Sequence, residues 1–140
     1  VLGWDPAFRT GCKLAVVDAT GKVLDTKVIF PTAPQNKVEE SKAELKKLIK
    51  KYNVDKSFVG TGGINVYTGN ISTLTTDDGL TKSAIIDISN ETYIITENIK
   101  LQKDSFFNFS NLSKVKGCIF NTLEDEIILE KLKNYDLIIM

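Results

Sequence analysis

The sequence predicts a single α/β domain built on a mixed, mostly parallel sheet of about seven strands, with an N-terminal antiparallel hairpin and helices on both faces. Three observations lead to this prediction. Short apolar runs recur along the chain, amphipathic segments lie between several of them, and a four-residue turn joins two of the earliest runs. Strands that alternate with helices favour parallel pairing, whereas a short turn between neighbouring strands favours an antiparallel hairpin.

The predicted strands are short apolar runs bounded by Gly, Pro, Asn or Asp. We expect them at residues 1–5, 12–18, 23–30, 57–59, 92–96, 117–121 and 136–140. Gly21 lies in the turn between the second and third runs, where a hairpin commonly has glycine. Residues 65–76 are polar and predicted to be irregular, and the glycine-rich segment 60–63 is predicted to be a loop or tight turn.

Three helices are predicted, at residues 38–52, 77–88 and 123–133. The first has apolar residues with a 3.6-residue period between charged ones, which predicts one buried stripe on a solvated helix. A run of lysines on this helix is expected to serve surface solubility, with a basic binding patch as the alternative. These lysines are Lys46, Lys47, Lys50 and Lys51.

The second and third helices are predicted from weaker signals. In the second helix, the residues expected to share one buried face are Leu80, Ala84, Ile85 and Ile88. In the third, Thr122 is the predicted N-cap, because Asp125 follows it three residues later, as in a capping box.

Composition limits the classes of function. The chain has 140 residues, a length typical of one domain, and 18 basic and 18 acidic residues, so no net charge draws it to nucleic acid or to an anionic membrane. Histidine is absent, which excludes Ser–His, Cys–His and His–metal mechanisms. Without an apolar run of about 20 residues or a signal-peptide pattern, we expect a soluble domain with no membrane association, no cofactor and no partner, cytoplasmic if a cell expresses it.

The two cysteines, Cys12 and Cys118, lie far apart in the sequence and neither belongs to a CxxC motif. A structural zinc site usually takes four ligands, so we expect no metal site. Two buried thiols in strands are the favoured interpretation, and a disulfide between them is the alternative.

The amino-acid composition changes near residue 55. Residues 1–55 contain two Ile, seven Val, five Ala and two Asn, whereas residues 56–140 contain thirteen Ile, three Val, one Ala and eight Asn. A central parallel sheet can favour Ile over Val, but that preference does not explain the additional Asn. We therefore predict a composite origin, with a junction near this residue.

The first part of the chain resembles the ribonuclease H-like, YqgF-type domain of the Tex transcription accessory proteins. The resemblance covers residues 1 to about 54 and rests on the stretches VLGWDPAFRTGCKLAVVDATGKVLDT and IFPTAPQNK. It implies metal-dependent nuclease chemistry, in which Asp5 matches the first carboxylate of the family. Trp4 and Ala7 depart from the family pattern, which has an aliphatic residue and a glycine there, and suggest repacking or a fluorescent probe.

Residues from about 55 to 140 resemble the C-terminal effector domain of DeoR-family sugar-responsive repressors. The stretches that carry this resemblance are DKSFVGTGGI, LTT, TKSAII and the closing YDLII. It implies a sugar-phosphate site whose residues here would be Gly60, Thr61, Gly62, Gly63 and Lys100. In that family a second phosphate loop belongs to the half of the effector domain that the resemblance does not cover.

These observations favour an engineered or chimeric folded scaffold that is not an enzyme and has no native biochemical activity. The first alternative is weak binding of sugar phosphates or other anions, inherited from a DeoR-type domain. The second is a metal-dependent ribonuclease H-like nuclease, for which the set of carboxylates is incomplete because only Asp5 matches.

Overall fold

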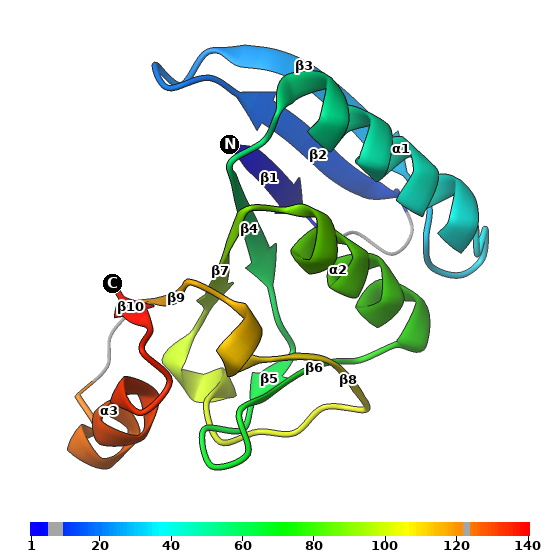
Figure 1. The fold of residues 1–140 in the computed structure, drawn as a ribbon. Helices are drawn as coiled ribbons and strands as arrows, with labels where there is room; N and C mark the ends of the chain where they lie inside the picture. The colour runs from blue at the N-terminus through cyan, green and yellow to red at the C-terminus, as the bar shows by residue number, and fades with distance from the viewer. Residues whose placement is uncertain (6–9, 122–123) are drawn as a thin grey trace.

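The computed structural model describes residues 1–5, 10–121 and 124–140 (Figure 1). Within these residues, one sheet contains β1 (Leu2–Asp5), β2 (Cys12–Val17), β3 (Val23–Ile29), β4 (Lys56–Gly60), β7 (Glu91–Thr96), β9 (Gly117–Phe120) and β10 (Ile138–Ile139). The strand order is β10-β9-β7-β4-β1-β2-β3. β1, β2 and β3 pair antiparallel, and the pairs from β1–β4 to β9–β10 are parallel. The predicted mixed sheet of seven strands with an N-terminal hairpin is confirmed.

β1 and β4 lie side by side in the middle of this sheet, although more than fifty residues separate them. Leu2 pairs with Ser57 and Gly3 pairs with Phe58. The change in composition near residue 55 therefore falls immediately before a central strand, and hydrogen bonds between β1 and β4 join the two parts of the chain.

A second sheet, which the sequence did not predict, contains β5 (Gly63–Ile64), β6 (Asn70–Thr73) and β8 (Phe107–Asn111) in the order β5-β6-β8. The prediction that residues 65–76 are irregular is wrong for β6. Its residues Asn-Ile-Ser-Thr show no apolar alternation, yet Ser72 and Thr73 are buried. Hydrogen bonds to distant residues offset the cost of burying these polar side chains. For example, Ser72 Oγ accepts the backbone N–H of Ser105 at 2.8 Å.

The helices of the described residues are α1 (Val38–Tyr52), α2 (Thr76–Ile88) and α3 (Glu126–Lys133), with short 3-10 turns η1 (Asn98–Lys100) and η2 (Leu112–Lys114). All three predicted helices are confirmed, the first with the predicted bounds. The prediction for the third cap differs from the structure. Asp125 is the N-cap, and its Oδ1 accepts the N–H groups of Ile127 and Ile128 at 3.0 and 3.1 Å, while Thr122 lies outside the described residues.

Register shows which face of the large sheet carries α1 and α2. Leu2, Val16, Asp25 and Ser57 form one rung across β1, β2, β3 and β4, so their side chains point to the same face. On this face the Tyr52 hydroxyl of α1 donates to Asp25 at 2.9 Å. Ser57 Oγ lies 2.6 Å from the hydroxyl of the residue that follows α2. Hence α1 and α2 share one face of the sheet.

One hydrophobic core occupies the space between the sheet and the helices. Its members come from both parts of the chain, and examples are Leu2, Leu45, Val59, Ile94 and Leu132. Ion pairs on the outside of the core, such as Lys27–Glu44 at 2.9 Å, link β3 to α1. None of the helices in the described ranges is long and apolar enough to cross a membrane.

Candidate functional site

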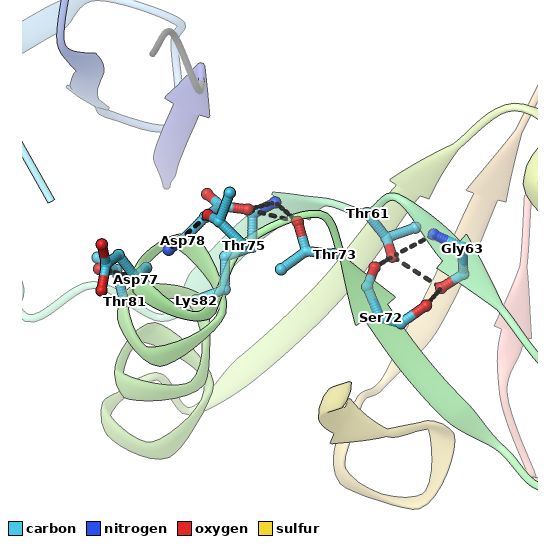
Figure 2. Close-up of polar contacts among 9 residues, drawn as sticks. All are labelled: Thr61, Gly63, Ser72, Thr73, Thr75, Asp77, Asp78, Thr81 and Lys82. Carbon is cyan, nitrogen blue, oxygen red and sulfur yellow. Dashed lines mark hydrogen bonds and ion pairs between the residues drawn. The ribbon is translucent and has the colours of Figure 1, made fainter. Parts of the chain in front are cut away.

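The predicted glycine-rich turn begins where β4 ends, at the carboxyl edge of the parallel strands. Ligands commonly bind at this edge in α/β sheets. Here the chain passes from Gly60 through the buried Thr61 to β5, which pairs with β6. Thr61 Oγ1 lies 2.7 Å from the carbonyl oxygen of Ser72 and 2.9 Å from that of Gly63, as Figure 2 shows.

The backbone amides of Gly62 and Gly63 already have partners within the protein. Gly62 N–H donates to the carbonyl of Ser72 at 2.9 Å, and Gly63 N–H donates to Thr61 Oγ1 at 3.2 Å. A phosphate cradle needs amides that point at the ligand instead. The Gly62 N–H therefore joins the turn to β6 of the second sheet, and the Gly63 N–H closes the turn on Thr61.

Close packing explains the glycine at position 63. A Cβ atom there would overlap the carbonyl oxygen of Lys103. Lys100, the other predicted phosphate ligand, ends η1, and the next residue, Leu101, forms a parallel bridge with Ile64. The structure thus brings the backbone around Lys100 close to the turn, and its half-buried side chain makes no hydrogen bond or ion pair with the described residues.

A buried charged cluster, which the sequence pattern did not predict, lies beside the turn. It consists of Thr73 at the end of β6 and of Asp78 and Lys82 on α2 (Figure 2). Lys82 Nζ lies 2.6 Å from Asp78 Oδ2, and the two side chains are only 4% and 2% exposed. Thr73 Oγ1 donates to the same carboxylate oxygen at 2.5 Å and accepts from Lys82 Nζ at 3.3 Å.

The surroundings of this cluster satisfy most of its polar atoms. Lys82 Nζ lies 5.6 Å from the centre of the Phe109 ring, a favourable position for a cation. Asp78 stands in the first turn of α2, where the helix dipole favours a negative charge, and its N–H donates to the cap residue Thr75 at 3.3 Å. Asp78 Oδ1 is buried without a hydrogen-bond partner among the described residues.

The Asp-x-x-x-Lys spacing at the start of a helix is the signal that could have revealed this pair. The predicted buried face of α2 instead consists of apolar residues. Of those, Ile85 is buried, but Leu80 is 39% exposed. The buried face of α2 includes Asp78 and Lys82, because each charge neutralises the other.

Asp5, the predicted vestigial carboxylate, occupies a different place. It is exposed at the end of β1, opposite Lys13 of β2 and on the sheet face that α1 and α2 leave open. A shallow concavity of about 640 Å³ covers this part of the sheet. Its lining residues are Gly3, Trp4, Asp5, Lys13, Leu14, Ala15, Thr26, Lys27 and Val28.

This concavity has no carboxylate cluster. Asp5 is the only acidic residue among the described residues that line it. Across residues 1–5, 10–121 and 124–140, no group of three or more Asp, Glu, Cys or His side chains could hold a metal ion. Although Trp4 borders the concavity, alternation along β1 directs its side chain to the face opposite that of Asp5, where it is buried and its Nε1 has no hydrogen-bond partner in the described structure. Ala7, the second departure from the family motif, lies outside the described residues.

Both cysteines are buried thiols, Cys12 in β2 and Cys118 in β9, and no disulfide joins them. Burial raises the pKa of the Cys118 thiol to about 12. A thiol of this kind is protonated at neutral pH and unreactive as a nucleophile. The favoured prediction of two buried cysteines in strands is confirmed.

Comparison with known proteins gives matches for the first part of the chain. Residues 1–98 match the model of the Tex protein YqgF-like domain. The uncharacterized protein YdcI of Bacillus subtilis is 56% identical over 62 residues, 44% of this chain and 9% of that protein. Protein tex of Bordetella pertussis is 44% identical over 62 residues, 44% of this chain and 8% of that protein. The transcriptional accessory protein Tex of Neisseria gonorrhoeae is 39% identical over 71 residues, 51% of this chain and 9% of that protein.

The matched stretches therefore cover less than a tenth of the length of these relatives. The matched range, residues 1–98, includes β1 to β7 with α1 and α2. It contains Asp5 and the glycine-rich turn and ends before Lys100. The resemblance of the N-terminal part to Tex proteins is confirmed.

Proposed function

The chain belongs to the Tex protein YqgF-like domain family, and on that premise we propose that it is a folded, non-catalytic module with a ribonuclease H-like sheet. Function depends on the residues of a site and not on the fold alone. The observation that carries the proposal is the isolation of Asp5. In the longer polypeptides that its relatives represent, such a module would supply a folded surface and no phosphodiester chemistry.

The number of carboxylates around Asp5 supports this proposal. Phosphoryl transfer by two divalent ions needs several carboxylates that converge on the metals, and one carboxylate holds Mg²⁺ weakly. Asp5 faces Lys13 across the ladder, and its neighbours on the same face, Gly3, Ala15 and Thr26, supply no acidic ligand. Lys13, a cation next to the one acidic side chain of the described lining, further opposes the binding of a metal cation.

A nuclease assay tests this proposal. The purified chain, incubated with single-stranded and duplex nucleic acid in Mg²⁺ or Mn²⁺, is expected to show no cleavage above that of Asp5→Asn. Asp87→Asn, at an exposed position on α2, is the matched control because it removes the same charge away from the concavity. Metal-dependent cleavage that Asp5→Asn abolishes and Asp87→Asn retains would replace the proposal with a nuclease.

Binding of sugar phosphates at the glycine-rich turn is the alternative function. The DeoR-like resemblance of residues 55–140 and the proximity of η1 to the turn support it. The internal hydrogen bonds of Gly62 and Gly63 oppose it, so we expect no better than millimolar, non-selective affinity. Isothermal titration with small sugar phosphates is the test, and a saturable micromolar signal lost in Lys100→Ala would establish the alternative. Gly63→Asp is a poorer variant, because its side chain would overlap Lys103.

A composite origin, natural or engineered, remains part of the proposal and rests on the change in Ile and Asn content near residue 55. The family match continues through this residue to residue 98, so it marks no boundary there. The recurrence of one uninterrupted reading frame for all 140 residues in many genomes would contradict a composite origin.

A further inference from the structure

The outer edge of β3 is an unpaired strand edge of the large sheet. β3 is the last strand in the order, and its side chains Val23, Leu24 and Val28 are 55%, 44% and 46% exposed. No described segment forms a ladder with this edge. Such an edge presents unpaired N–H and C=O groups to other chains.

The hydrogen-bond pattern shows which groups of β3 point outward. Val1 and Val17 exchange both backbone hydrogen bonds at 3.0 Å, so the odd-numbered residues of β2 direct their backbone N–H and C=O groups to β1. The even-numbered residues of β2 direct theirs to β3, where Leu14 pairs with Lys27 and Val16 with Asp25. Asp25 and Lys27 therefore bond to β2, and the residues between and after them direct their N–H and C=O groups to the free edge.

The usable edge is short and has defined limits. A register shift at Val16/Val17 disturbs the ladder beyond Leu24. At the other end, the carbonyl of Phe30 already accepts the N–H of Lys37 at 2.8 Å. The stretch left between these limits is Leu24–Val28, with Thr26 at its centre.

This stretch is complementary to itself. In an antiparallel pair centred on Thr26, Asp25 lies opposite Lys27 of a second copy, and Lys27 opposite Asp25. Thr26 lies opposite Thr26, and the apolar Leu24 opposite Val28. The outward-pointing groups of both copies then meet in hydrogen-bonded pairs, and the opposite charges meet in the closer, non-hydrogen-bonded pairs. A centre at Asp25 or at Lys27 would place two like charges opposite each other.

The charges of α1 extend this pattern. Asp25 forms an ion pair with Lys51 at 3.1 Å, and Lys27 forms one with Glu44 at 2.9 Å. The Lys27 and Asp25 side chains are still 46% and 30% exposed, so each has room for a second partner. Across the two-fold axis the charges would alternate in sign, from Lys51 to Asp25 and then to Lys27 and Glu44 of the second copy.

We propose that two copies of this chain associate through their β3 edges, in an antiparallel, two-fold pair centred on Thr26. A two-fold interface uses the same surface on both subunits, which is what a self-complementary strand provides. The pairing would continue the sheet from one copy to the next and would join the two concavities that Thr26 and Val28 line.

Sedimentation velocity of charge-reversed variants tests the proposal. The unmodified chain is expected to form dimers as its concentration rises. Asp25→Lys and Lys27→Asp each place two like-charged pairs at the interface and should weaken self-association about tenfold or more. An equimolar mixture of the two variants restores opposite charges and should form a heterodimer. Each variant also loses an ion pair to α1. Recovery of dimerisation in the mixture therefore shows that the single variants are folded and that only their interface was weakened.

A backbone variant provides an independent measurement. The N–H of Thr26 points outward, so Thr26→Pro removes a donor from the edge and none from the ladder with β2. It is expected to be monomeric, whereas the matched Thr26→Val should dimerise like the unmodified chain. A chain that stays monomeric up to about 1 mM, a mixture that fails to associate, or Thr26→Pro that dimerises as Thr26→Val does would each overturn the proposal.

Discussion

The buried Asp78–Lys82 pair makes the most specific prediction about stability. Lys82→Met keeps most of the side-chain volume but removes the ammonium group that lies 2.6 Å from Asp78 Oδ2. At this distance the attraction is about 6 kcal/mol for an effective dielectric constant of about 20. Desolvation of both charges offsets much of it, but loss of Lys82 leaves a buried carboxylate without its counter-charge, held by the hydrogen bond from Thr73 and the dipole of α2. We therefore expect unfolding free energy to fall by about 3–5 kcal/mol.

Urea unfolding followed by the fluorescence of Trp4, the single tryptophan, measures this change. With a slope of about 2 kcal/mol per molar urea, the midpoint should fall by about 2 M. The matched control is Lys42→Met on α1, which breaks an ion pair of similar length, 2.9 Å, to the 86% exposed Glu39. That change should stay below about 1 kcal/mol. Equal losses in the two variants would refute the reasoning.

The remaining predictions concern the turn, the acid limb of stability and the buried thiol. Gly63→Ala should destabilise the fold by about 1–3 kcal/mol, because its new methyl group meets backbone, whereas Gly60→Ala, in open space, should change the urea midpoint little; equal effects would contradict this assignment. Hydrogen bonds from Tyr52 and Lys51 lower the pKa of Asp25 below its ordinary 3.8. The stability that the ionised Asp25 gives to the folded state is therefore present above pH 3.8 and is lost as the pH falls through the lowered pKa. Tyr52→Phe should therefore move the acid-unfolding midpoint to higher pH, and an unchanged midpoint in circular dichroism would show that the bond contributes nothing. Because burial raises the pKa of Cys118 to about 12, its alkylation at pH 8 should follow global unfolding, and rapid labelling of the native chain would disprove its burial.

The large sheet and α1 could be predicted because each carries a repeating pattern of apolar residues. Apolar runs with hairpin chemistry identify β2 and β3, and the period of α1 matches its buried residues Leu45, Leu48 and Ile49. The second sheet carried no such pattern. β6 is a strand because Ser72 and Thr73 are bonded by distant segments, and a local pattern does not record those partners.

The candidate sites, like the strands, could be predicted only where a local sequence pattern marks them. The glycine-rich turn was located correctly, but glycine is needed there for close packing against Lys103, and a sequence shows the residue without its neighbour. The buried pair on α2 was missed because Asp78 and Lys82 are typical of a solvated helix face. Sequence patterns indicate which residues are polar, but only the tertiary structure indicates which polar residues find a partner inside.

The adjacency of β1 and β4 has a practical consequence. A polypeptide cut in the linker between α1 and β4, residues 53–55, would yield two fragments. One would expose the unpaired edge of β1 and the other the unpaired edge of β4, which pair with each other in the intact sheet. Neither piece could shield that edge alone, yet together they would re-form the ladder and bring Trp4 back out of water. The linker at residues 53–55 is thus a position at which the chain can be divided to make a split reporter, in which the fluorescence of Trp4 reports the association of the two fragments.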